Sequence, residues 1–160
     1  MQKFLRGAAL AACCVLSFGT IRVVAQATDP IVGSWELNVA RSKYSPGPTL
    51  KSESRTYVVS GQEIKASSKG VDGDGKPMAS QWTINYDGKD RALTGTPDAD
   101  MLSLKRIDAN HAEFMQKKAG KIVSTGTRVI SPDGRMMTIA TKGTDASGRA
   151  FTNVEVFDKR

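Results

Sequence analysis

Few residues of this 160-residue chain are suited to acid–base or metal chemistry. The one histidine, His111, stands in "DANHAE" at the start of an expected strand, on the face opposite Phe114. A lone histidine gives neither a metal site nor a base with an orienting partner, so we interpret His111 as a solvated side chain. The sequence also has no G-x-S-x-G signature that places a nucleophile beside a base. We therefore predict no catalytic residue and expect that the protein is not an enzyme.

Two pairs of carboxylates occur at short spacing. Asp72 and Asp74 in "VDGDGK" match part of a calcium loop, but Gln81 stands where a bidentate Glu would be needed. Asp98 and Asp100 in "TPDAD" fall on an expected turn, where a carboxylate caps backbone N–H groups. We predict no metal site and no cofactor.

Two arginines share a strand face with apolar residues. Arg55 alternates with Tyr57, and Arg106 alternates with Leu104. An arginine inside an apolar lumen is costly unless it is paired. Three interpretations stay open: an ion pair with Glu155, a contact with the carboxylate of a ligand, or snorkelling to water near the strand ends.

The elements that must position these residues are strands. Short segments rich in β-branched and aromatic residues alternate with Gly, Asp, Ser and Thr. In "SQWTINY", Trp82, Ile84 and Tyr86 fall on one face, which is the period of a strand with one buried side. The connections "SGQ", "YDGKD", "KAGK" and "SPDGR" are hairpin turns, whereas Pro46 and Pro48 interrupt the pattern. We predict an all-β fold, an antiparallel up-and-down β-barrel of about 8–10 strands, because closure removes exposed sheet edges.

The apolar faces of these strands define a candidate lumen. Its inward residues are expected to be Trp82, Ile84, Tyr86, Leu102, Leu104, Phe114, Ile122 and either Met136 or Met137. The methionines are interpreted as core. The candidate ligand-binding residues are Tyr57, Trp82, Tyr86, Leu104, Arg106 and Phe114.

The first 27 residues have the pattern of a secretory signal peptide. Lys3 and Arg6 precede an apolar run, and the run is followed by "AQA", which ends at Ala27. We predict cleavage after Ala27, a secreted or periplasmic location, no integral membrane segment in the mature chain, and one domain over residues 28–160. The alternative is a lipoprotein anchored at Cys13. We favour the soluble form, because the apolar stretch before Cys13 is very short.

Removal of residues 1–27 changes the charge and the cysteine content. Both cysteines and three of the 23 basic residues (Lys3, Arg6, Arg22) lie in this segment, so 20 basic and 16 acidic residues remain, a net charge of +4. The mature chain then has no disulfide and no thiolate. Its charges are interspersed, which argues against nucleic acid binding. We expect a monomer.

The first and last strands resemble those of a known superfamily. "VGSWELNVARSKY" is similar to the first strand of the calycins, the lipocalin and fatty-acid-binding-protein superfamily, whose G-x-W motif corresponds here to Gly33 and Trp35. "NVEVFDK" resembles the last strand of the intracellular fatty-acid-binding proteins. The likeness extends to secreted bacterial lipocalin-like proteins over essentially all of residues 28–160. It implies a ligand-binding barrel in which Trp35 has a structural role, closing one end while Gly33 lets the chain pass close over it.

The sequence departs from the fatty-acid-binding proteins at two places. Their last strand holds a ligand carboxylate with an Arg and a Tyr, where this chain has Glu155 and Phe157. Their helix–turn–helix lid has no counterpart in "ARSKYSPGPTLKSE". We predict a secreted, non-enzymatic protein that binds a small hydrophobic or amphipathic molecule in the barrel. The alternative is a protein-binding module, such as a periplasmic protease inhibitor, with a filled barrel.

Overall fold

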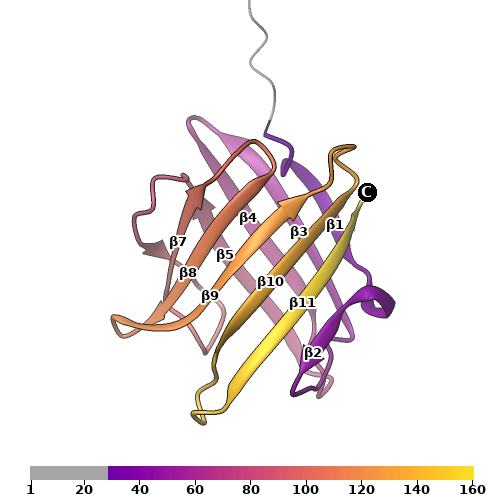
Figure 1. Ribbon diagram of the computed structural model, residues 1–160, viewed down its shortest axis with the longest axis vertical. Helices are drawn as coiled ribbons and strands as arrows, with labels where there is room; N and C mark the ends of the chain where they lie inside the picture. Colours follow the sequence, from indigo (N-terminus) through magenta and orange to yellow (C-terminus); the bar gives the residue numbers. More distant parts are fainter. Residues whose placement is uncertain (1–28) are drawn as a thin grey trace, which may run out of the picture.

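A computed structural model describes residues 29–160 (Figure 1). The predicted signal peptide, its cleavage site and Cys13 lie outside the described residues. The elements are β1 (Gly33–Leu37), the 3₁₀ helix η1 (Val39–Arg41), β2 (Lys43–Ser45), β3 (Ser52–Ser60), β4 (Glu63–Val71), β5 (Pro77–Ile84), β6 (Arg91–Ala92), β7 (Met101–Arg106), β8 (His111–Lys118), β9 (Lys121–Ile130), β10 (Met136–Thr144) and β11 (Ala150–Lys159).

The strands form one antiparallel sheet that curves into a nearly closed barrel (Figure 1). The order is β5-β4-β3-β1-β11-β10-β9-β8-β7-β6, and β2 pairs with β11. The two ends of this order meet where Gln81 and Thr94 exchange two backbone hydrogen bonds of 3.0 Å. The predicted all-β, up-and-down barrel is therefore confirmed. The described residues form eleven strands, because β2 and β6 add short pairings of three and two residues.

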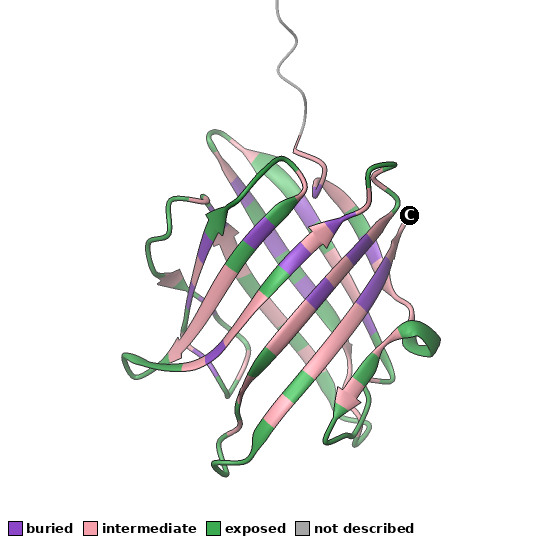
Figure 2. Cartoon of the chain, viewed as in Figure 1, coloured by how far each residue is buried: buried purple, intermediate pink, exposed green. Residues whose placement is uncertain are grey.

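One half of the barrel is packed solid. Trp35, Ile31, Met137 and Phe157 are fully buried at the end where β1 begins and β11 ends, the upper end in Figure 1. The indole Nε1 of Trp35 donates to the carbonyl oxygen of Ile31 at 2.7 Å, so its polar atom is satisfied inside this core. The burial of alternate residues along the strands is visible in Figure 2.

Gly33 lies beside this packed end in a conformation that favours glycine, with a φ of 126°. A Cβ on Gly33 would lie 3.0 Å from Cε of Lys159. The ammonium of Lys159 lies over the Trp35 ring, 5.0 Å from the ring centroid. The strand start and the end of β11 therefore pack closely over the indole.

The inward face of β9 differs from the sequence prediction. Ile122 is 58% exposed, because the pairing of β8 with β9 shifts register between Gln116 and Lys117. Such an irregularity moves the residues on one side of it to the other face. Of the two candidate methionines, Met137 is the buried one.

Within residues 29–160, no helix has the length and apolar character needed to cross a membrane.

Candidate ligand-binding site

The half of the barrel away from the packed end contains a cavity of about 300 Å³. One part of its wall is apolar and is formed by Trp82, Ile84, Leu93, Leu102, Leu104, Phe114 and Ile139. The polar residues of the lining include Glu53, Arg55, Ser68, Ser80, Gln116, Arg128, Asn153 and Glu155. An apolar wall with a few convergent polar groups is the usual lining of a small-molecule site.

Two aromatic contacts shape the apolar wall. The rings of Tyr57 and Trp82 meet edge to face, with centroids 5.9 Å apart. The ring of Phe114 lies over Gly126 of β9, where an added Cβ would stand 2.5 Å from Cζ of Phe114. Glycine at this position therefore lets the Phe114 ring approach the neighbouring strand closely.

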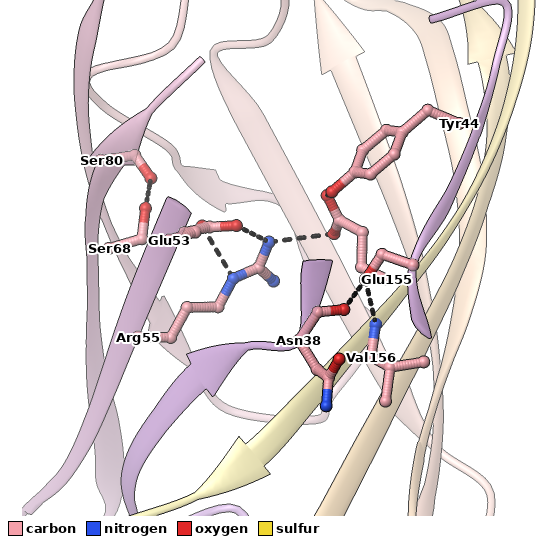
Figure 3. A network of polar contacts seen from close by, with 9 residues as sticks. Asn38, Tyr44, Glu53, Arg55, Ser68, Ser80, Glu155 and Val156 are labelled. Carbon is pink, nitrogen blue, oxygen red and sulfur yellow. Dashed lines mark hydrogen bonds and ion pairs between the residues drawn. The ribbon is translucent and has the colours of Figure 1, made fainter. Parts of the chain in front are cut away.

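A network of two carboxylates and one guanidinium lies on the polar wall (Figure 3). Arg55 donates from Nε and Nη2 to the two oxygens of Glu53, at 2.8 and 3.0 Å. The same Nη2 donates to Oε2 of Glu155 at 3.2 Å, and the Tyr44 hydroxyl donates to Oε1 of Glu155 at 3.1 Å. The guanidinium also stacks 4.5 Å from the centroid of the Phe157 ring. Arg55 is thus held from three sides.

Burial and charge act on this network in opposite directions. Burial by itself lowers the pKa of Arg55, but the carboxylates of Glu53 and Glu155 outweigh it and hold that pKa well above its ordinary value. Burial raises the pKa of the Glu155 carboxyl, the Arg55 charge opposes this, and the nearby Glu53 carboxylate adds to the increase. The pKa of Glu155 is raised on balance, so the lumen holds Glu155 in its charged form less readily than water does.

Arg128 of β9 is the second buried arginine of the lumen, and it is only 5% exposed. Its Nη2 donates to the hydroxyl of Tyr86 at 2.6 Å. Its Nε and Nη1 are buried and have no hydrogen-bond partner among residues 29–160. Buried donors are almost always paired, so two donor nitrogens without partners on one buried cation require an explanation.

The structure brings four of the six predicted ligand-binding residues together. Tyr57, Trp82, Leu104 and Phe114 all line the cavity. Tyr86 and Arg106 are not part of its lining. Tyr86 lies beyond the end of β5 with a φ of 42° and contacts Arg128.

Arg106 packs behind Tyr86, with its guanidinium 3.9 Å from the Tyr86 ring centroid, and forms an ion pair with Asp29. Its side chain is 38% exposed. A ligand contact for Tyr86 or Arg106 stays a prediction. Tyr86 would affect a ligand indirectly, through its hydrogen bond to Arg128.

The sequence interpretation did not assign Glu53 or Arg128 to the lumen. Glu53 falls on the same face as Arg55 and Tyr57 by strict alternation, which is a signal that was present in the sequence. The pairing of Arg55 with Glu155 is one of the three interpretations raised above, and it is confirmed. The interpretation that Arg55 snorkels to water is wrong, because its side chain is only 16% exposed.

The other chemistry-bearing residues lie at strand ends and in turns. His111 is exposed, and its Nδ1 lies 2.8 Å from Oδ1 of Asp108. Asp72 accepts from the backbone N–H of Lys76 at 2.8 Å and caps the turn between β4 and β5. Across the part of the chain that the structure describes, His, Cys, Asp and Glu form no group of three or more that could hold a metal ion.

No protein-family profile matches the sequence, and no curated protein does. Among solved structures, Rv2717c from M. tuberculosis is similar, with a TM-score of 0.54 at 12% identity over 82% of this chain and 93% of Rv2717c. The zebrafish ileal bile acid-binding protein complexed with cholic acid gives 0.49 at 11% identity, over 82% of this chain and 99% of that one. The redesigned β-barrel mFAP1 bound to DFHBI gives 0.42 at 16% identity, over 81% and 95%.

These findings define a class of fold. The nearly closed antiparallel barrel and its likeness to Rv2717c confirm the predicted barrel fold. At 12% identity the likeness shows the fold alone, so the function has to be argued from the cavity.

Proposed function

We propose that this protein is a non-enzymatic binding protein that holds a small amphipathic molecule in its barrel, with an acidic group of the ligand on Arg128. The observation that carries the proposal is a pair of buried nitrogens without hydrogen-bond partners among residues 29–160, Nε and Nη1 of Arg128, a residue that lines the cavity. A guanidinium stays protonated in proteins, so the buried cation of Arg128 calls for an acceptor from outside the described residues.

A ligand carboxylate would supply that acceptor. Guanidinium and carboxylate form short, charge-assisted hydrogen bonds, and the two groups match in geometry. An unsatisfied buried donor costs about 1–3 kcal/mol, and more when it is charged, so its pairing by a ligand favours binding. The remainder of the ligand would lie against Trp82, Leu104 and Phe114, where burial contributes about 25 cal/mol per Å² of apolar surface.

The cavity favours this function over the alternative of a protein-binding module with a filled barrel. A cavity of about 300 Å³ is at the lower end of the range for ligand pockets. The proposal therefore specifies a small ligand.

Secretion belongs to the same proposal. It rests on the charged start, apolar run and "AQA" exit of residues 1–27. In this view the protein binds its ligand outside the cytoplasm.

A displacement titration tests the proposal. The anionic dye 1-anilinonaphthalene-8-sulfonate serves as the fluorescent probe, and octanoate as the competitor. We expect the dye to bind and octanoate to displace it. Arg128→Gln should weaken octanoate by about tenfold or more, because a charged hydrogen-bond pair is lost. Trp82→Ala should weaken it as well, through lost apolar contact.

Arg135→Gln is the matched control, because Arg135 is exposed and the substitution changes the net charge equally. It should leave the octanoate affinity unchanged. If Arg128→Gln folds and binds octanoate as tightly as the wild type, the ligand does not use Arg128 and the proposal is wrong.

A further inference from the structure

The cavity lining includes a cation without an anionic partner and, when Glu53 and Glu155 are both ionised, an excess negative charge. Arg128 contributes a cation whose one hydrogen bond among residues 29–160 is to the neutral hydroxyl of Tyr86. On the polar wall, Glu53 and Glu155 share the single guanidinium of Arg55. Two carboxylates against one guanidinium leave an excess negative charge whenever both are ionised. Unpaired charges in a poorly solvated cavity are costly, so each of them requires a partner.

These two charges lie in one row across three neighbouring strands. Arg128 of β9 pairs with Ile139 of β10, and Ile139 pairs with Glu155 of β11. Residues in register on adjacent strands project to the same face of the sheet, here the lumen. Two inter-strand spacings place the Cα atoms of Arg128 and Glu155 about 10 Å apart. All three residues line the cavity.

Arg128 and Glu155 do not neutralise one another. Ile139 stands between them in the row, and it is buried. Each oxygen of Glu155 already accepts a hydrogen bond, one from Tyr44 and one from Arg55. Among the ion pairs of residues 29–160, none includes Arg128. A ligand in the cavity therefore meets a cation, an apolar side chain and an anion in sequence: Arg128, Ile139 and Glu155.

We infer that the carboxylates of Glu53 and Glu155 form a second subsite, which receives an ammonium group, and that the ligand is a zwitterion: a small amphipathic acid that also carries an amine. The inference rests on the proposed function, because the acidic group of the same ligand lies on Arg128. A carboxylate oxygen accepts more than one hydrogen bond, so Glu53 and Glu155 keep acceptor capacity for an added donor.

The row also sets the length of the ligand. Both side chains extend from Cα atoms about 10 Å apart into a shared cavity, so they approach a ligand from two sides. The acid and the amine of the ligand must then be joined by a short apolar segment that lies over Ile139. A long alkyl chain between the two charges would not fit this spacing.

Competition against the same dye tests the inference with matched probes. These are straight-chain carboxylates of four to eight carbons, the ω-amino acids of the same lengths, and octylamine. One ω-amino acid of the series should bind the wild type about tenfold or more tighter than the plain acid of equal length, because its ammonium adds charge-assisted hydrogen bonds. Octylamine, which has no acid for Arg128, should bind more weakly than that ω-amino acid.

The variants locate the ammonium subsite. Glu155→Gln should abolish the preference for the ω-amino acid while it retains the plain acid. Glu53→Gln should reduce the preference too, because either substitution neutralises the excess charge. If Glu155→Gln does not fold, Glu53→Gln is the variant that tests the inference. Glu113→Gln, a surface change of the same charge on β8, should keep the full preference.

Two results distinguish a failure of the proposed function from a failure of the zwitterion inference. If neither acids nor amino acids displace the dye, the proposed function is wrong. If plain acids bind as tightly as the amino acids at every length, or if the preference survives in folded Glu155→Gln and Glu53→Gln, the zwitterion inference is wrong while the binding of an acid on Arg128 stands.

Discussion

Arg55 and Arg128 are the same kind of residue in the same lumen, and they differ in what satisfies them. Arg55 has three hydrogen bonds to two carboxylates and stacks on Phe157. Arg128 has one hydrogen bond, to Tyr86. A buried ion pair orders its surroundings, whereas a buried cation with free donors is prepared for a partner. We therefore propose that Arg55 organises the wall and that Arg128 binds the ligand.

Glu155 should give the protein a characteristic pH dependence of stability. Its pKa is raised in the folded protein by burial and by Glu53, above the ordinary value of 4.5. The folded state therefore holds this proton more tightly than the unfolded state. The contribution of Glu155 to stability is greatest below pH 4.5 and is lost as the pH rises through the folded pKa.

Glu155→Gln removes this titration. In urea unfolding at a series of pH values, the stability of the variant relative to the wild type should increase as the pH rises above 4.5. The variant also loses a charged acceptor for Arg55. This loss changes the free energy of unfolding by the same amount at every pH, so it leaves the pH dependence unchanged. Glu113→Gln is the control at the surface. Parallel curves for the wild type and Glu155→Gln would show that the pKa of Glu155 is not raised.

Trp35 should act on stability before it acts on binding. The indole is fully buried in the packed half of the barrel, away from the cavity lining. Trp35→Ala should lower the free energy of unfolding by about 3–5 kcal/mol, the usual effect of removing a large buried aromatic side chain. Denaturant unfolding measures this loss, and the dye titration at low temperature measures binding. A variant with normal stability and lost binding would contradict the structural role.

At the scale of the strands, alternation predicted much of the site. Period-two patterns assign to the lumen four residues that line the cavity: Tyr57, Trp82, Leu104 and Phe114. The pattern is informative because apolar residues in these strands mark the inward face. It failed at Ile122, where the register shift beside Gln116 lies between two strands and leaves no trace in the sequence of either one.

The strand of Arg128 gives a mixed signal. Ile130 alternates with Arg128 and is apolar, but Ser124 and Gly126 on the same face are not. The position of Arg128 beside Ile139 and Glu155 follows from the pairing of three strands. That pairing is a property of the folded sheet, which single-strand patterns do not contain.

Gly126 provides a test of how β9 supports the site. A Cβ at this position would lie 2.2 Å from the carbonyl oxygen of Ala140 and 2.5 Å from the Phe114 ring. Gly126→Ala should therefore displace Phe114, destabilise the protein by about 1–3 kcal/mol, and weaken dye binding. Thr127→Ala, an exposed neighbour on the same strand, is the control and should change neither quantity measurably. Wild-type stability in Gly126→Ala would contradict this packing.

The whole molecule divides into two parts with different tasks. The end around Trp35 and Phe157 is packed solid and supplies apolar burial. The other part keeps a cavity of about 300 Å³ with unbalanced charges, which lowers stability and provides a site. The length and turn pattern of the chain predicted the barrel. Whether its lumen is open depends on side-chain volumes across facing strands, which strand periodicity does not describe.

Native mass spectrometry of the protein purified from its own host tests the central claim most directly. The account predicts a bound small molecule that survives gentle ionisation, is released on denaturation, and is absent from folded Arg128→Gln but present in Arg135→Gln. The zwitterion inference adds that the released molecule carries both an acid and an amine. The bare mass of the chain under native conditions, or the same adduct in Arg128→Gln, would contradict the account.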